Sequence, residues 1–170
     1  AVEAGYRMLR LGGSAVDAHS TSTAYLEVDP ASLAAPTLQW RIALRDLDAL
    51  LDLDANGDGQ LIWGEVQDRA TDINALATSS MVVKSGAAAC VLRFDSPRYV
   101  RVADAGYAHL DGTAACNAGG SLTLDYRLFE GVDPSHRVLL SMQGANQPRI
   151  LEPGATVTVA AADAAAEMPS

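Results

Sequence analysis

The chain has 170 residues, of which 49% are hydrophobic and 19% charged, and this composition excludes a wholly disordered protein. The length suits one domain with its own core, or one domain that carries an insertion. Asp and Glu total 21 against 12 Lys and Arg, so the formal net charge is -9. An acidic chain of this kind disfavours nucleic acid and anionic membrane surfaces as partners, and it is compatible with cation binding.

Residues 1–18 differ from the rest of the chain and predict a helix that ends at Gly12-Gly13. The stretch EAGYRMLRLGGSAVDA resembles the N-terminal helix–Gly-Gly–helix of the gamma-glutamyltransferase family, which would imply an enzyme. The likeness stops at about Ala18, and no later segment resembles that family's catalytic threonine region. We therefore prefer a helical segment of uncertain origin. The first residues lack the pattern of a signal peptide, so we expect an exported protein to be present here in mature or trimmed form.

From Thr23 onward the hydrophobic pattern becomes that of short strands separated by Gly, Pro and Asp turns. The expected strands are 25–28, 39–44, 81–84, 90–94, 99–103, 107–110, 121–129, 137–142 and 155–160. This pattern predicts a mainly β (α+β) fold, namely an immunoglobulin-like antiparallel β-sandwich over residues 19–160. The Ala-rich residues 161–170 predict a flexible tail.

A helical period interrupts the strands and predicts an insertion at residues 46–78. It consists of a short helix over 46–53, a loop rich in Gly and Asp, and a second helix over 63–77. The loop, residues 54–65, matches the EF-hand calcium pattern D-x-N-x-D-G-x-L-x-x-x-E between its two helices. The predicted ligand positions are Asp54, Asn56, Asp58, Gln60, Ile62 and Glu65.

Each loop position has a chemical reason. The side-chain oxygens at positions 54, 56 and 58 alternate along a turning chain and point to one centre, while Gly59 permits the sharp bend. Gln60 would contribute its carbonyl oxygen, Ile62 stands where a water commonly binds, and Glu65 would give both carboxylate oxygens. Three carboxylates and one amide favour Ca2+ over Mg2+, because a bidentate glutamate suits the larger ion.

The loop occurs once in the sequence, although EF-hands usually pair. The apolar Leu61 therefore needs another partner, either the protein's own sheet or the same loop in a second chain, and we expect the first. A single loop on a β-scaffold indicates a structural calcium ion, with an affinity of about 10⁻⁴–10⁻³ M as in extracellular modules.

Cys90 and Cys116 stand beside two expected strands, and they are either a redox or metal pair or a structural disulfide. We favour the disulfide, because the two are too far apart for C-x-x-C chemistry and no ligand-spaced histidine accompanies them. A disulfide would imply an oxidising compartment. His19, His109 and His136 are scattered, no nucleophile elbow or H-E-x-x-H motif occurs, and we expect no catalysis.

From about His19 to Thr156 the order of the motifs resembles that of a known protein family. The order is a strand, W-R-I-A-L-R-D-L-D-A-L-L-D-L-D, the calcium loop, W-G-E-V, D-Y-R-L-F and D-P-S-H-R. It is similar to the extracytoplasmic N-terminal domain of the HupE/UreJ membrane proteins, which are linked to nickel handling. The resemblance implies an exported, periplasmic domain that precedes membrane helices, and two cysteines at positions equivalent to Cys90 and Cys116. The metal-transport motifs of the membrane helices do not occur in this chain.

The leading hypothesis is a calcium-binding periplasmic or extracellular domain without catalysis, tethered to the membrane in the full-length protein. Its partners would be the calcium ion and a membrane-embedded continuation or a protein partner. The alternatives are a protein-interaction module that calcium merely stabilises, and an accessory domain for nickel handling.

Overall fold

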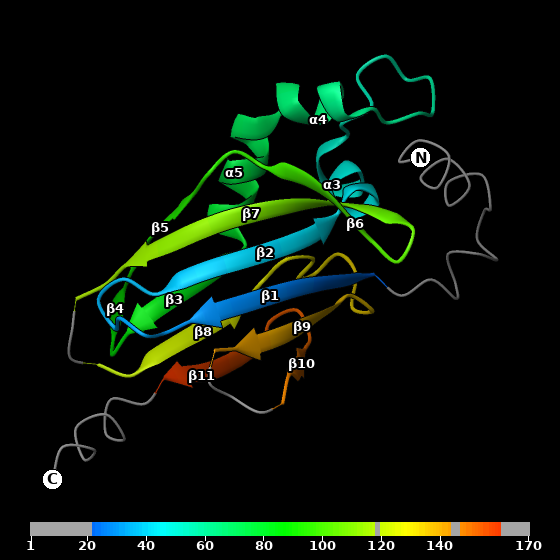
Figure 1. Cartoon of the computed structure of the whole chain (residues 1–170). Coiled ribbons are helices and arrows are strands. Elements are labelled where there is room, and N and C mark those ends of the chain that lie inside the picture. Colours follow the sequence, from blue (N-terminus) through cyan, green and yellow to red (C-terminus); the bar gives the residue numbers. More distant parts are fainter. Residues whose placement is uncertain (1–21, 118–119, 144–146, 161–170) are drawn as a thin grey trace, which may run out of the picture.

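The computed structural model describes residues 22–117, 120–143 and 147–160 of the chain. The helix expected over residues 1–18, the histidine at position 19 and the tail 161–170 lie outside the described residues. The described part consists of two β-sheets and three helices (Figure 1). This arrangement confirms the mainly β fold with two sheets.

The larger sheet has seven strands in the order β10-β9-β1-β2-β7-β5, and β6 also pairs with β7. Its strands are β1 (Thr23–Asp29), β2 (Thr37–Ala43), β5 (Val91–Phe94), β6 (Arg98–Val102), β7 (Ala105–Ala115), β9 (Arg137–Met142) and β10 (Arg149–Leu151). β5 and β6 pair with successive parts of the long strand β7, so together they form one edge of the sheet. Ala103 and Asp104 make the tight turn between β6 and β7, both with positive φ.

The smaller sheet has four strands in the order β11-β8-β3-β4. These are β3 (Met81–Ser85), β4 (Ala88–Ala89), β8 (Leu122–Tyr126) and β11 (Thr156–Ala160). The strand expected over 121–129 is observed over 122–126, where Leu122, Leu124 and Tyr126 are fully buried and the residues between them are half-buried. The strand ends at Tyr126, three residues before the predicted end, and the chain then turns through Phe129 at a φ of 69°.

The core lies between the sheets and is joined by aromatic contacts. The ring of Trp40 on β2 meets Tyr126 on β8 edge-on, with centroids 5.7 Å apart, and it also contacts Phe94 at 6.0 Å. Trp40 and Tyr126 have no exposed surface. Burial of these large rings supplies much of the apolar free energy that holds the sheets together.

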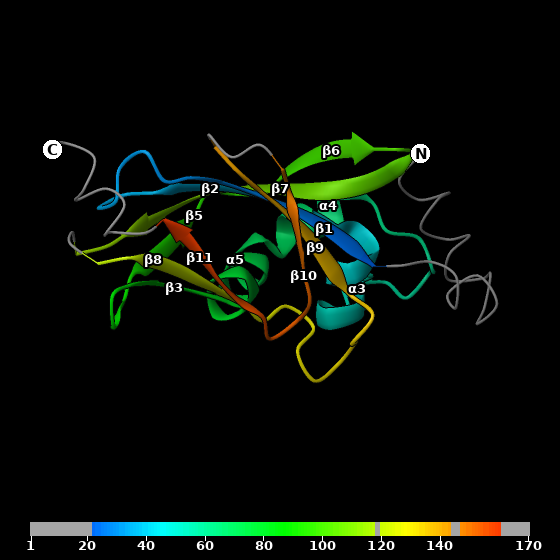
Figure 2. The same ribbon diagram turned by 90° about the horizontal axis from the view of Figure 1, so that it is seen from below.

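Three helices fill the region beside the smaller sheet. They are α3 (Leu44–Leu51), α4 (Trp63–Asp68) and α5 (Ala70–Ser79). Helix α3 contacts β2 and β7, and α5 contacts β3 and β5, so the helices cover the inner face of the larger sheet (Figure 2). Among the described residues, no helix covers the other face of that sheet, which we call the open face.

Two sequence-based expectations about the helices need correction. The first helix begins at Leu44, two residues earlier than predicted, because the chain leaves β2 at Ala43 with extended geometry and turns at once. The second, expected as one helix over 63–77, is broken at Arg69, where φ is -109° and ψ is 21°. The described helices therefore begin at Leu44 and end at Ser79, and their interpretation as an insertion over 46–78 stays a prediction.

The purely antiparallel pairing also needs correction. Among the described strands, β1 and β9 pair in parallel, with Thr23 opposite Arg137 and Val28 opposite Met142. A long connection separates these strands along the chain, and parallel pairing requires such a crossover. The short strands β4 and β10 were not predicted, because neither has enough residues to give an alternating pattern. The immunoglobulin-like topology stays a prediction.

Cys90 and Cys116 form the predicted disulfide, with Cα atoms 4.5 Å apart. Cys90 lies where the chain passes from β4 in the smaller sheet to β5 in the larger one, and Cys116 follows β7. The bond therefore joins two points at which the chain leaves or enters the larger sheet. Such a bond is typical of an oxidising compartment. Within the described ranges, no helix has the length and apolar character to cross a bilayer.

Candidate functional site

The expected calcium loop, residues 54–65, leads from the end of α3 into α4 and projects beyond the helices (Figure 1). Its start is fixed by Asp48 on α3. The Asp48 carboxylate accepts hydrogen bonds from the backbone N–H groups of Leu53 at 2.8 Å and Asp54 at 3.1 Å. Burial raises the pKa of Asp48, and these two hydrogen bonds oppose that effect. The incoming helix and the first loop residue are thereby held in a fixed relation.

The bend of the loop depends on two glycines and on Asp54. Gly57 and Gly59 have φ values of 68° and 79°, which side chains with a Cβ atom rarely adopt. The Asp54 carboxylate accepts a hydrogen bond from the N–H of Gly59 at 2.8 Å, across the bend. The residue expected to provide the first ligand is therefore also the residue that closes the turn.

Three of the predicted ligand side chains lie close together. The N–H of Gln60 donates to Asp58 at 2.9 Å, and this bond is the main cause that lowers the pKa of Asp58, with smaller contributions from the side chains of Asp54 and Asn56. Asn56 in turn accepts a hydrogen bond from the N–H of Asp58 at 3.2 Å. The side chains at positions 54, 56 and 58 thus lie near one another, and their role as calcium ligands stays a prediction.

Glu65 joins the end of the loop to its start. One carboxylate oxygen accepts from the N–H of Ile62 at 3.1 Å, and the other from the N–H of Ala55 at 3.0 Å. Glu65 thus caps α4 as an acidic residue in its first turn. In this arrangement no group of three or more His, Cys, Asp or Glu in the described ranges is spaced to hold a metal. The ligand roles of all six positions stay predictions, including that of Ile62, which is 48% exposed.

Leu61 packs the single loop against the core of its own chain. Its side chain has no exposed surface and belongs to the same core cluster as Trp40 and Leu44. The loop is therefore anchored in the core of its own chain, as expected, while the next residue, Ile62, faces solvent.

Arg69 connects the two sides of the loop and was not identified from the sequence. Its guanidinium donates to the backbone carbonyl oxygens of Leu51 and Asp52, each at 3.1 Å, and to the Asp72 carboxylate at 2.6 Å. These carbonyls stand at the end of α3, where helix geometry leaves them without partners inside the helix. Arg69 thus holds the helix that follows the loop against the helix that precedes it.

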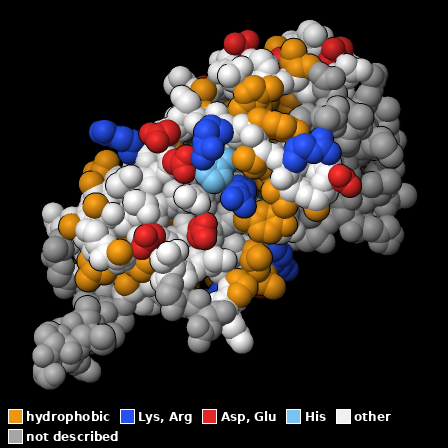
Figure 3. All heavy atoms as spheres, in the orientation of Figure 1, with side chains coloured by type: hydrophobic (Ala, Val, Ile, Leu, Met, Phe, Trp, Pro, Cys, Tyr) orange, Lys and Arg blue, Asp and Glu red, His pale blue; other side chains and the backbone are white. Residues whose placement is uncertain are grey.

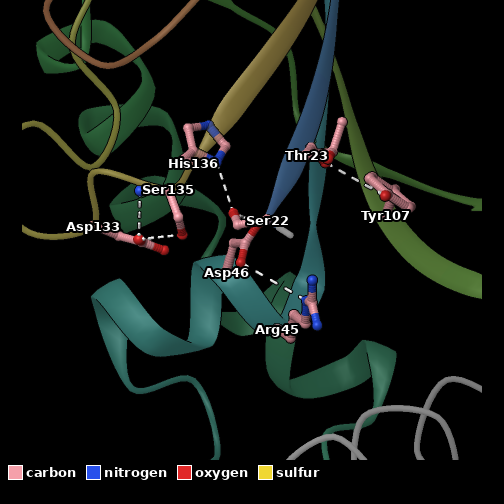
Figure 4. Close-up of polar contacts among 8 residues, drawn as sticks. All are labelled: Ser22, Thr23, Arg45, Asp46, Tyr107, Asp133, Ser135 and His136. Atoms are coloured by element: carbon pink, nitrogen blue, oxygen red, sulfur yellow. Dashed lines mark hydrogen bonds and ion pairs between the residues drawn. The ribbon is translucent and has the colours of Figure 1, made fainter. Parts of the chain in front are cut away.

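A buried chain of polar groups lies near the start of α3 (Figure 4). Ser22 donates to the Asp46 carboxylate at 2.6 Å, and its hydroxyl also lies 2.6 Å from Nδ1 of His136. Nε2 of His136 is 2.8 Å from the Tyr126 hydroxyl. Since Ser22 donates to Asp46, Nδ1 carries the proton and Nε2 accepts from Tyr126. Every hydrogen bond in this chain is therefore directed toward Asp46.

Burial shifts the pKa values of both the acid and the imidazole in this chain. It raises the pKa of Asp46 to about 6, against the hydrogen bond from Ser22 and the charge of Arg45, while Asp133 raises it further. It lowers the pKa of His136 to about 4, against the attraction of Asp133. Ser22 stands between the acid and the imidazole, whereas a nucleophilic triad places the imidazole in the middle. His136 has no exposed surface, so we interpret the chain as a structural link.

Only one part of this link has a local pattern in the sequence. Asp133 accepts hydrogen bonds from the N–H of Ser135 at 2.9 Å and from its hydroxyl at 2.6 Å, a turn that the order Asp-Pro-Ser favours (Figure 4). That turn aims His136 into the core. Its partner Ser22 is 114 residues away in sequence, and no local pattern connects the two.

Comparison with models of known protein families finds no match for this chain. Comparison with curated proteins finds none either.

Proposed function

We propose that the protein is a calcium-binding domain of an exported protein, in which the ion is structural and the domain itself catalyses no reaction. The loop 54–65 would hold the ion through the side chains of Asp54, Asn56, Asp58 and Glu65, the carbonyl oxygen of Gln60 and a water at Ile62. The helices on either side would make it an EF-hand inserted into the β-sandwich.

The observation that carries the proposal is the convergence of the three side chains at positions 54, 56 and 58 in a loop that its own chain anchors. The N–H of Gln60 and the side chains of Asp54 and Asn56 lower the pKa of Asp58. Hard oxygen donors gathered in this way suit Ca2+ and offer nothing to a soft metal. The burial of Leu61 in the chain's own core supports a site that needs no second EF-hand.

Glu65 would change partners when calcium binds. Its two carboxylate oxygens accept hydrogen bonds from Ile62 and Ala55, and a bidentate contact with calcium would use the same oxygens. The ion would then replace two backbone hydrogen bonds. This exchange favours a modest affinity, in the range of about 10⁻⁴–10⁻³ M typical of extracellular modules.

The proposed location is the periplasm or the cell exterior. The Cys90–Cys116 disulfide supports an oxidising compartment, where millimolar calcium is also available. The similarity of the D-Y-R-L-F and D-P-S-H-R stretches to the HupE/UreJ family suggests a membrane-embedded continuation. An immunoglobulin-like topology belongs to the same proposal.

Calorimetry on the metal-stripped protein tests the proposal directly. We expect calcium uptake at one site and a melting temperature that falls when a chelator is added, because an ion at 100 times its dissociation constant stabilises the fold by about 2.7 kcal/mol. Asp54→Ala and Glu65→Gln should abolish both effects. Asp68→Asn, which removes an exposed carboxylate of α4 outside the loop, should leave both unchanged. Absence of uptake at millimolar calcium contradicts the proposal.

A further inference from the structure

The open face of the larger sheet carries a hollow of about 160 Å³. Alternation along β1 and β2 sends Leu26 and Trp40 into the core, so their neighbours Tyr25 and Arg41, which are paired in register, face outward. On this face a histidine lies among basic and acidic side chains (Figure 3). The side chains that line the hollow come from Tyr25, Glu27, Gln39, Arg41, Leu139 and Ser141.

Arg41 on β2 is held in place by the residue paired with it on the neighbouring strand β7. Its Nε donates to Nδ1 of His109 at 3.2 Å, so Nδ1 is an acceptor and the proton sits on Nε2, which donates to Asp111 at 3.1 Å. Arg98 donates to the other oxygen of Asp111 at 3.0 Å. His109 is only 4% exposed. The buried imidazole of His109 thus orients the guanidinium of Arg41 at the edge of the hollow.

This arrangement leaves the outer end of Arg41 available. Only Nε is engaged, and neither terminal nitrogen of Arg41 has a hydrogen bond or ion pair within the described ranges. The two terminal nitrogens form a fork that matches the two oxygens of a carboxylate. Because the side chain is already oriented, a ligand would lose little of its binding energy to ordering it.

Glu27 supplies the opposite charge on the same hollow. It is exposed and has no hydrogen bond or ion pair with any other described residue. It lies two residues along β1 from Tyr25, which is opposite Arg41, so the two charges are offset by about 7 Å along the strand. A second hollow adjoins the first at Glu27 and Gln39 and includes Asp29, which makes this end acidic. The acidic end disfavours a dianion such as phosphate.

We propose that this face binds a small zwitterion, with its carboxylate on Arg41 and its ammonium group on Glu27. Glu27 and Arg41 are diagonal neighbours on adjacent strands, with a separation of about 7–8 Å, so the two charged groups of the ligand would be a similar distance apart. Linear ω-amino acids and the termini of dipeptides share this chemistry. Tyr25 and Leu139 would contact the apolar stem between the charges. The inference is independent of calcium and concerns the opposite side of the sheet from the helices.

Titrations monitored by NMR chemical shifts would identify the ligand class. The probes are 6-aminohexanoate and dialanine, which carry both charges, together with hexanoate and hexylammonium, which carry one each. We expect saturable chemical-shift changes in β1 and β2 with one or both zwitterions. The zwitterion that binds more tightly shows whether the site prefers a linear ω-amino acid or a dipeptide. Weaker or no binding of the single-charge probes is expected. Equal affinity for hexanoate and 6-aminohexanoate, or no saturable shift with either zwitterion, overturns the proposal.

Variants assign the two charges. Arg41→Gln should weaken the binding of both the zwitterion and hexanoate by about 10-fold or more, since it removes charge-assisted hydrogen bonds to the carboxylate. Arg41→Lys, which keeps the charge, should retain only part of the affinity. Glu27→Gln should weaken the binding of the zwitterion and leave the affinity for hexanoate unchanged. Arg101→Gln removes an arginine of β6 that pairs with Asp104, and it should change nothing. Equal loss in the Arg101 variant overturns the proposal.

Discussion

The guanidinium of Arg69 donates a hydrogen bond to the backbone carbonyl of Leu51, 18 residues earlier, across the base of the proposed calcium loop. The same side chain reaches the carbonyl of Asp52 and the carboxylate of Asp72. One arginine therefore satisfies two carbonyls at the end of α3 and stands at the junction of α4 and α5. The relation of the helices depends on this side chain even when no ion is bound.

Replacement of Arg69 by Gln should lower the free energy of unfolding by about 1–2 kcal/mol, because carbonyls at the helix end lose a charged donor. We also expect weaker calcium binding, since the two ends of the loop become less fixed. Urea unfolding and calorimetry would measure both. Asp72→Asn serves as the control and should cost less than about 1 kcal/mol, because it removes only a surface ion pair. An Arg69 variant as stable as the wild type would argue against the clamp.

Leu61 and Ile62 offer a matched pair of substitutions in adjacent residues. Leu61→Ala should destabilise the protein by about 2–5 kcal/mol, because it empties a position with no exposed surface. Ile62→Ala should cost much less, about 0.5 kcal/mol, since about half of that residue is exposed to solvent. The midpoint of unfolding should not depend on protein concentration. A midpoint that rises with concentration would indicate that Leu61 packs against a second chain.

The features that the sequence predicted well are local ones. The strand 137–142 has the predicted bounds, because the alternation that predicts it lies within the strand itself. The disulfide could be predicted because the chain has only two cysteines, which leaves one possible pairing. In each case the pattern and its physical cause lie within the same few residues, or within a very short list of possible partners.

The features that the sequence missed depend on distant residues. The break at Arg69 reflects its contacts with the end of α3, which outweigh a continuous helical pattern over 63–77. The parallel pairing of β1 with β9 and the link from Ser22 to His136 join segments more than a hundred residues apart. Arg41 and His109 meet only because β2 and β7 are neighbours. The hydrophobic periodicity of a single segment does not predict contacts between residues that lie far apart in the sequence.

Reduction of the Cys90–Cys116 disulfide should lower the free energy of unfolding by about 3–4 kcal/mol. The two cysteines are 26 residues apart in the sequence, and the bond between them lowers the conformational entropy of the unfolded chain. Urea unfolding with and without reductant would measure the difference, and the double Cys→Ala variant should match the reduced protein. Thiol titration of the unfolded, non-reduced protein should find no free thiol. Two free thiols would contradict the bond.

The buried polar chain should make stability respond to pH in two opposite ways. The pKa of Asp46 is raised from 3.8 to about 6, so the folded state holds its proton more tightly and stability falls as pH rises through this interval. The pKa of His136 is lowered from 6.5 to about 4, so the unfolded state binds more protons there and stability rises with pH. Between about pH 4 and 6 the two contributions largely cancel in the wild type.

Asp46→Asn should uncover the contribution of His136, because asparagine still accepts the hydrogen bond from Ser22 but does not titrate. The stability of this variant relative to the wild type should therefore fall as pH is lowered from 6.5 toward 4, by up to about 3 kcal/mol. Thermal melting of both proteins at several pH values would measure the difference. Asp68→Asn should run parallel to the wild type, because that carboxylate is exposed. If the Asp46 variant also runs parallel, Asp46 titrates as an ordinary carboxylate and the balance between the two groups does not exist.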